Sequence, residues 1–316
     1  SDPNDLEKIV FTEIKYLLDT TQKPNVDDTG THTYTVKEVI PSANPSQGVT
    51  YDTTSFTVKV NVSDSGTGKL TVTKDASNPK VVFNNAYNTK TSTTLTAVKT
   101  LKGTTLNDGD FEFKLTQVDA SGAAVTGGVT QTKTNVGTDV TFDAINYTQA
   151  DAGKTYYYKI TETDQKKPGY TYSTATYTYQ VVVTDDGKGT LTATKTLIGA
   201  TKAEFISYYE AKGKLTLTGV KTLQGRPDFP LTLDEFTFTA TDPATGKTYK
   251  GSMEAKTGNI TFDDVSYIKN ANQDDTKTTH TLLITEDSIT SPGVTLVTTQ
   301  PITVTVTVTD NGDGTL

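Results

Sequence analysis

The chain has 316 residues, with 29 Lys and Arg against 37 Asp and Glu, and a net charge of −8 at pH 7. This length predicts two or three domains, and the acidic balance argues against nucleic acid or an anionic membrane surface as a partner. There is no Cys, so disulfides, thiolate metal sites and cysteine nucleophiles are excluded. No apolar run is long enough to span a membrane, and the polar first residues lack the apolar segment of a signal peptide. Threonine makes up about one residue in five, which favours β-strands.

Four blocks of sequence recur in the same order along the chain, which is the pattern of tandem repeats. The first block has the form TLTxVKTLxG, the second ends in tyrosine, the third ends in glutamate, and the fourth is a hairpin. Each hairpin alternates Thr with Val or Tyr around a glycine-containing turn, which predicts a two-stranded ribbon with one wet face. The blocks lie at 94–103 and 216–225, at 9–16, 140–147 and 260–267, at Glu38, Glu162 and Glu286, and at 51–74, 172–195 and 296–316.

These blocks define a unit of about 120 residues, which ends after the hairpin with a short strand such as Val81–Tyr87. Residues 1–90 are expected to hold the C-terminal half of one repeat, residues 91–213 a complete repeat, and residues 214–316 a repeat without its last strand. Many short strands with frequent turns predict an all-β fold of tandem β-sandwiches. Because no Gly/Ser-rich or Pro-rich linker separates the units, we expect a stiff, elongated rod, as in a fragment of a longer repeat protein.

One set of residues at corresponding positions of the repeats could take part in a chemical reaction. It combines a lysine in the first strand, a glutamate in a middle strand and an asparagine in the last strand. Strand alternation places the lysine and the glutamate among apolar neighbours, where burial favours the neutral amine and the neutral acid. A neutral amine is a nucleophile, and a carboxylic acid can polarise an amide, so the three side chains could form a Lys–Asn isopeptide bond with loss of ammonia. A plain buried Lys–Glu ion pair is the alternative interpretation. The positions are Lys99 and Lys221, then Glu38, Glu162 and Glu286, then Asn85.

The TLTxVKTLxG opening, the YYYKITE block, the hairpin and the closing VVFNNAY resemble the streptococcal-type pilin isopeptide-linkage domain. This is the repeat module of Gram-positive major pilins and cell-wall-anchored adhesins, and the resemblance covers essentially the whole chain. It implies Ig-like or CnaB-like sandwiches in which the first and last strands are bonded through Lys and Asn with an assisting Glu. On that pattern Lys99 and Lys221 are the amines, Glu38, Glu162 and Glu286 the acids, and Asn85 the amide.

The sequence departs from the family pattern in the middle repeat. Ser207 stands where the asparagine is expected, and serine has no carbonyl carbon that an amine could attack. The first repeat has Glu38 and Asn85 without a lysine strand, and the third has Lys221 and Glu286 without an asparagine. By register, therefore, the chain completes no triad, and we expect Lys99 and Glu162 to remain an ion pair or a hydrogen-bonded pair.

Other motifs favour structural interpretations. The turn at 310–314 is rich in Asp and Gly but lacks the spacing of a calcium loop, and its counterparts at 64–68 and 185–189 indicate hairpin turns. His32 and His280 occupy the repeat position of Tyr156, so we expect neither a metal site nor a catalytic role. The tyrosines around Tyr156–Tyr158 and at Tyr170, Tyr172, Tyr177 and Tyr179 could stack on sugars, but strand alternation accounts for them equally well.

The sequence therefore predicts a non-enzymatic structural stalk or shaft of a bacterial surface pilin or adhesin, with no cofactor and no metal. Its expected partners are neighbouring repeats or pilin subunits, and its expected location is extracellular, in a pilus or attached to the cell wall. A ligand-binding adhesin domain that recognises a host glycan or matrix protein is the alternative function.

Overall fold

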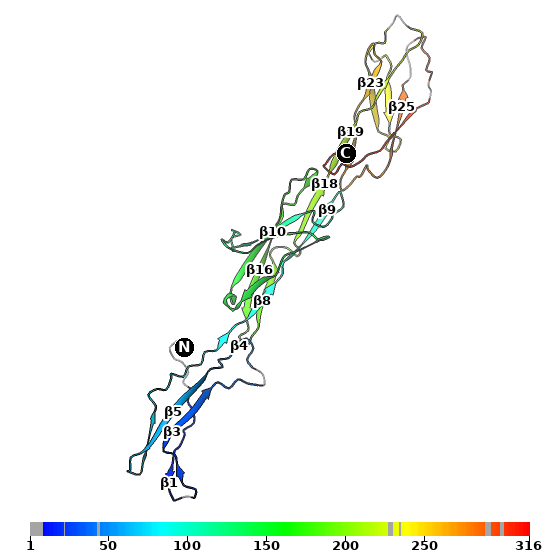
Figure 1. Ribbon diagram of the computed structural model, residues 1–316. Helices are drawn as coiled ribbons and strands as arrows, with labels where there is room; N and C mark the ends of the chain where they lie inside the picture. Colours follow the sequence, from blue (N-terminus) through cyan, green and yellow to red (C-terminus); the bar gives the residue numbers. More distant parts are fainter. Residues whose placement is uncertain are drawn as a thin grey trace. The chain divides into compact units, whose positions relative to one another are not determined.

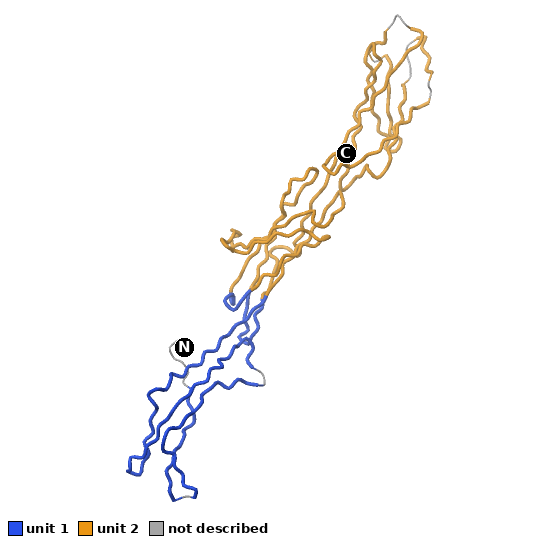
Figure 2. Tube along the Cα trace, viewed as in Figure 1, with its two compact units in different colours: residues 1–91, 147–153, 183–192 blue, residues 92–146, 154–182, 193–316 orange. Residues whose placement is uncertain are grey.

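The structure is a computed structural model that describes residues 9–21, 23–42, 45–226, 230–233, 235–287, 292–297 and 300–316. In these residues the fold is all-β, and the one helical element is a 3-10 turn at Gln149–Asp151 (Figure 1). The expected all-β fold is confirmed. The chain divides into two compact units, which comprise residues 1–91, 147–153 and 183–192, and residues 92–146, 154–182 and 193–316 (Figure 2). No helix in the described residues is long and apolar enough to cross a membrane.

The first unit is built on a three-stranded antiparallel sheet in the order β3-β5-β6. Its strands are β3 (Gly30–Lys37), β5 (Ser55–Asp64) and β6 (Leu70–Lys74). β5 and β6 are the arms of the first predicted hairpin, and Val62 is its buried residue. Two further short pairs belong to this unit, β1 (Leu18–Asp19) with β2 (Val26–Asp27) and β4 (Val49–Thr50) with β7 (Ala86–Tyr87).

One expected strand of this unit is shorter than the sequence pattern indicates. The closing strand expected at Val81–Tyr87 is paired only in β7, and the repeated block at 9–16 lies outside any strand. Alternation shows which side chains share a face, but a strand also needs a neighbouring backbone to bond with.

The middle of the chain forms two facing sheets, in the orders β11-β10-β14-β16-β17 and β12-β9-β18-β15. Phe113 of the first sheet and Phe205 of the second lie 5.3 Å apart between ring centroids and are both fully buried. β9 and β18 run parallel, and their neighbours are antiparallel. The strands are β9 (Thr96–Lys102), β10 (Glu112–Val118), β11 (Thr130–Thr134), β12 (Asp139–Thr141), β14 (Thr155–Glu162), β15 (Tyr170–Thr171), β16 (Thr176–Asp185), β17 (Leu191–Leu197) and β18 (Glu204–Tyr209).

The C-terminal part has a six-stranded sheet in the order β20-β23-β22-β21-β25-β26. Its core packs Phe236, Phe238, Met253, Phe262 and Leu282 together. The strands are β20 (Thr218–Val220), β21 (Phe238–Thr241), β22 (Thr248–Met253), β23 (Asn259–Phe262), β25 (His280–Glu286) and β26 (Ile302–Val306). Two linking pairs lie at the repeat boundaries, β8 (Lys90–Thr93) with β13 (Ile145–Thr148) and β19 (Ala211–Leu215) with β24 (Val265–Lys269).

Candidate cross-link sites

The middle sandwich brings Lys99, Glu162 and Ser207 together in its interior. Lys99 projects from β9 in one sheet, and Glu162 ends β14 in the facing sheet. The Lys99 Nζ lies 2.8 Å from Oε2 and 3.1 Å from Oε1 of Glu162, and both side chains are fully buried. The lysine and the glutamate therefore meet across the core, as the register of the repeats predicts.

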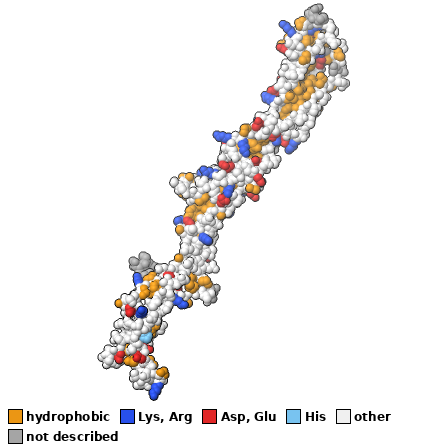
Figure 3. All heavy atoms as spheres, viewed as in Figure 1, with side chains coloured by type: hydrophobic (Ala, Val, Ile, Leu, Met, Phe, Trp, Pro, Cys, Tyr) orange, Lys and Arg blue, Asp and Glu red, His pale blue; other side chains and the backbone are white. Residues whose placement is uncertain are grey.

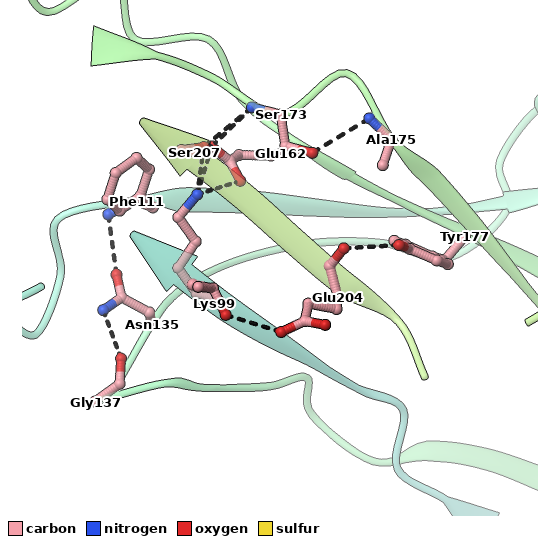
Figure 4. A network of polar contacts seen from close by, with 11 residues as sticks. Lys99, Phe111, Asn135, Gly137, Glu162, Ser173, Ala175, Tyr177, Glu204 and Ser207 are labelled. Atoms are coloured by element: carbon pink, nitrogen blue, oxygen red, sulfur yellow. Dashed lines mark hydrogen bonds and ion pairs between the residues drawn. The ribbon is translucent and has the colours of Figure 1, made fainter. Parts of the chain in front are cut away.

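Ser207 takes part in this pair as both donor and acceptor (Figure 4). Its hydroxyl donates to Oε1 of Glu162 at 2.6 Å and accepts a hydrogen bond from the Lys99 Nζ. The backbone N–H of Ser173 donates to the same hydroxyl oxygen at 3.0 Å. Serine thus meets the hydrogen-bonding needs of a site that carries two opposite charges, which is the condition for keeping such a site stable away from water.

Burial sets the electrostatics of the middle site. Loss of hydration lowers the pKa of the Lys99 ammonium, while the hydrogen bond and the charge of Glu162 oppose that shift. The Nζ also lies 3.9 Å from the centroid of the Phe111 ring, whose face stabilises a cation. A lysine with a lowered pKa has more of the nucleophilic neutral amine, but Ser207 offers that amine no electrophilic carbon.

The third repeat holds a second lysine–glutamate pair of the same design. Lys221 follows β20, and its Nζ lies 2.7 Å and 2.8 Å from the two carboxylate oxygens of Glu286 at the end of β25. The Lys221 Nζ lies 4.5 Å from the Phe236 ring centroid, as Lys99 lies over Phe111. Here each side chain of the pair keeps 15% of its surface exposed.

The first repeat places an asparagine, rather than a lysine, beside the corresponding glutamate. Nδ2 of Asn85 donates to Oε1 of Glu38 at 2.8 Å, and Oδ1 of Asn85 accepts from the backbone N–H of Asp52 at 2.8 Å. Oε2 of Glu38 is buried and makes no hydrogen bond with any residue that the structure describes.

Two contributors to these sites were not assigned a role by sequence reasoning. One is the backbone N–H that binds the last-strand side chain, from Asp52 in the first repeat and Ser173 in the second. The other is the aromatic ring under the lysine, Phe111 or Phe236. Both Phe residues recur after the TLTxVKTLxG block, so the repeat register was a usable signal for the rings. A backbone donor carries no such signal.

The tyrosines considered as a sugar-binding face are part of the structural framework instead. Tyr158 is fully buried, and the hydroxyl groups of Tyr177 and Tyr179 donate to the backbone oxygens of Glu204 and Thr96. The Tyr158 ring is therefore closed to a ligand, and the hydroxyl groups of Tyr177 and Tyr179 are engaged in the fold, which does not favour the sugar-binding interpretation.

The two histidines have equivalent structural surroundings. The Nε2 of His32 lies 2.7 Å from the backbone oxygen of Asp28, and the Nε2 of His280 lies 2.8 Å from that of Asp275. Their rings pack on Tyr16 and Tyr267.

On the visible face of the molecule, basic and acidic side chains are interspersed rather than gathered by sign (Figure 3).

The fold and the sites define a class of protein: tandem β-sandwich repeats whose cores place a lysine or an asparagine beside a glutamate. The family model for FctA, described as the Spy0128-like isopeptide containing domain, matches residues 2–88, 95–210 and 217–316. The chain therefore belongs to this family of isopeptide-containing domains, as a series of three repeats.

The solved structures that are similar to this chain include major pilins of Streptococcus pyogenes. Two single-substitution mutants match at 19% and 20% identity with TM-scores of 0.28 and 0.30, each over 62% of this chain and 82% of the pilin. The T-13 major pilin matches at 14% identity with a TM-score of 0.27, over 64% of this chain and 84% of the pilin. No curated protein matches the chain.

Proposed function

We propose that the chain is a load-bearing part of a bacterial surface shaft, and that it has no enzymatic activity. Family membership supports a structural pilus role, and the finer assignment is to a shaft located outside the cell, attached to the wall or polymerised with other pilin subunits. Its three repeats have the proposed bounds 1–90, 91–213 and 214–316.

The recurrence of one core site in three repeats is the observation that carries this proposal. Lys99 and Lys221 have the role of amines, Glu38, Glu162 and Glu286 that of assisting acids, and Asn85 that of the amide. A bond between first and last strands closes a loop of about 100 residues, which contributes roughly 4–5 kcal/mol in the chain-entropy model. Such a bond holds a repeat together under tension without cysteine. The middle repeat keeps the non-covalent version of the same site.

Antibody labelling of the source cell tests the location and the role together. Antibodies raised against residues 1–316 should label surface fibres along their length when viewed by electron microscopy. Label restricted to the cell interior, or to fibre tips alone, would contradict a shaft. Glycan and matrix-protein arrays probed with the purified chain address the adhesin alternative, because a shaft repeat should bind neither class of ligand.

A further inference from the structure

Where the first repeat meets the tip of the second, a tyrosine is held by a hairpin turn. The hydroxyl of Tyr87, at the end of β7, donates to Oδ1 of Asp185 at 2.9 Å. The backbone N–H of Gly189 donates to the same hydroxyl oxygen at 2.9 Å. Asp185 also accepts from the N–H of Gly187, so one carboxylate organises the turn and binds the tyrosine.

The second and third repeats meet in the same way. Tyr209, at the end of β18, donates to Oδ1 of Asp310 at 2.6 Å and accepts from the N–H of Gly314 at 3.4 Å. Asp310 accepts from the N–H of Gly312 as Asp185 does from its own turn. The Tyr209 ring is buried, and its pKa is raised to about 12 by burial first and then by Asp310. We call this arrangement the tyrosine joint.

Close backbone contact accompanies both tyrosine joints. A Cβ added to Gly48 would lie 3.1 Å from the Cα of Gly189, and one added to Gly169 would lie 2.7 Å from the Cα of Gly314. All four glycines have a positive φ, so each is required both by its turn and by the approach of the other chain segment. The contact is therefore a built feature that appears twice.

The first repeat carries the same turn with nothing docked on it in the described residues. The N–H of Gly66 donates to Oδ1 of Asp64 at 2.8 Å, as in the other two turns. Gly68 has the positive φ of Gly189 and Gly314, but a Cβ added there would meet no atom within 4 Å. The turn that binds the tyrosine in the other two joints is thus already formed at 64–68.

The backbone segment beside this turn, around Leu17, makes the same hydrogen bonds as the corresponding segment in an occupied joint. The N–H of Leu17 donates to Oδ2 of Asp28 at 2.7 Å, and the Leu17 oxygen accepts from the Asp28 N–H at 3.0 Å. Ile268 makes the same two bonds with Asp275, at 2.8 Å and 3.1 Å. The opposite edge of the Ile268 segment pairs with β19, which follows Tyr209 in the chain.

Apolar side chains at the first edge are exposed where their counterparts are buried. Ile14 keeps 51% of its surface exposed, whereas Ile145 and Val265 at the same repeat position keep 4% and 3%. Residues 13–18, with 64–72, line an open hollow of about 700 Å³. Exposed apolar side chains beside a polar turn are typical of a binding surface.

We propose that the turn at 64–68 and the edge at 14–18 form a docking surface for the tyrosine-bearing end of another repeat of this family. The incoming tyrosine donates to Asp64 and accepts from the Gly68 N–H, and the short strand after it adds to the edge as β19 adds to β24. In both occupied joints the tyrosine ends the last strand of one repeat, and the turn belongs to the next repeat along the chain. The incoming repeat therefore presents its C-terminal end to the turn at 64–68. This inference deepens the proposed shaft function and rests on it only for the nature of the partner.

A peptide titration tests the docking surface on the intact chain. The probe is a synthetic peptide with the sequence of residues 207–217, which contains Tyr209 and β19, and the matched control replaces Tyr209 with Phe. Added to the ¹⁵N-labelled chain, the tyrosine peptide should shift the amide resonances of Gly66, Gly68 and residues 14–18 in a saturable way. The phenylalanine peptide should bind at least about tenfold more weakly, because it cannot bond to a carboxylate.

An Asp64→Ala chain completes the thermodynamic cycle. On that chain the difference in affinity between the two peptides should shrink, because only the hydrogen bond from the Gly68 N–H then distinguishes them, while the resonances of β3 and β5 show that the sheet is intact. Absence of saturable shifts up to millimolar peptide, shifts at other residues, or equal binding of both peptides to the unmodified chain would overturn the proposal. None of these results bears on cross-linking, so failure of the docking surface is distinguishable from failure of the shaft function.

Discussion

The lysine–glutamate pairs of the second and third repeats use the same residues at the same register, yet they differ in their contact with water. Lys99 and Glu162 are fully buried, whereas Lys221 and Glu286 each keep 15% of their side-chain surface exposed. The difference lies in the last strand. β18 lies beside β9 and places Ser207 against Lys99, and no strand of the described third repeat covers Lys221 in that way.

This comparison shows that the ion pair does not by itself make the reactive environment. Burial lowers the pKa of Lys99, and β18 places Ser207 against the buried pair. The pairing of β18 with β9 therefore both closes the sandwich and completes the environment of Lys99 and Glu162.

The largest expected effect comes from restoring the missing amide in the closed pocket. Ser207→Asn places an amide carbon beside the Lys99 amine and the Glu162 acid, so we expect an isopeptide bond with loss of one ammonia. Intact mass spectrometry measures the loss, and the unmodified chain should have its full sequence mass. Stability of the middle repeat against unfolding should rise by roughly 4–5 kcal/mol.

The control for this prediction removes the assisting acid. Ser207→Asn combined with Glu162→Ala should fold and retain its ammonia. A Ser207→Asn chain that folds without cross-linking would show that Lys99 and Glu162 are an ordinary ion pair, and an ammonia deficit in the unmodified chain would show that a partner had been misplaced.

The second prediction measures how much the closed pocket depends on its lysine. Lys99→Met leaves a buried carboxylate with Ser207 as its partner, which should destabilise the middle repeat by about 3–5 kcal/mol. Lys221→Met is the matched control, and it should destabilise the third repeat by less than Lys99→Met does the middle one, because the Lys221–Glu286 pair is less completely buried. Amide hydrogen exchange, resolved by repeat, measures both values. Equal losses would mean that closure of the sandwich does not isolate the pair.

The third prediction concerns the tyrosine joint between these two repeats. The pKa of Tyr209 is about 12 in the folded chain, while tyrosine in an unfolded chain titrates near about 10. In this window the unfolded state loses a proton that the folded state keeps, so stability should fall as the pH rises from about 10 to 12. Tyr209→Phe should remove this contribution and lower stability at neutral pH by roughly 1.5–3 kcal/mol.

Tyr208 is the matched control for this measurement, because it is the adjacent residue and is 46% exposed. Urea unfolding of Tyr208→Phe should reproduce the pH profile of the unmodified chain. If both variants keep the same alkaline loss of stability, Tyr209 does not hold the joint through its hydroxyl.

The smallest expected effect is the pH dependence from Lys99, and it has the opposite sign. Burial lowers the pKa of Lys99 in the folded chain below its ordinary value of 10.5. Between these two pKa values the unfolded chain binds a proton that the folded chain does not, so stability gains a contribution as the pH rises through this window. Lys99→Met should lack that gain, whereas Lys221→Met provides a comparison that keeps it.

Repeat register predicted the all-β fold, the order of the core blocks and the meeting of Lys99, Glu162 and Ser207. These features follow from side-chain type and spacing along a strand. The closing strand expected at Val81–Tyr87 is paired only at its last two residues, because a sequence pattern describes one strand and says nothing about its neighbour. The backbone donor of Ser173 was not predictable either, since every residue offers the same N–H group.

The tyrosine joint illustrates the same limit. Sequence comparison identified the turns at 64–68, 185–189 and 310–314 as equivalent, and it explained their aspartates as turn formers. Each aspartate does organise its turn. That two of them also bind a tyrosine about 100 residues away depends on how consecutive repeats meet, which local spacing does not record.

The parallel pairing of β9 and β18 has a mechanical consequence. The chain enters the middle repeat at the N-terminal side of β9 and leaves it from the C-terminal end of β18, and the two strands are paired over five successive residues. Because the two strands are parallel, the start of β9 and the end of β18 lie at opposite ends of the pair. A pull on these two points therefore displaces β9 and β18 in opposite directions along their length. The ladder bonds between them are then loaded in shear and must break together, whereas a hairpin pulled at its open end unzips one bond at a time. Lys99 and Ser207 lie on these two strands, so a covalent bond between the positions would stop the sliding at its source.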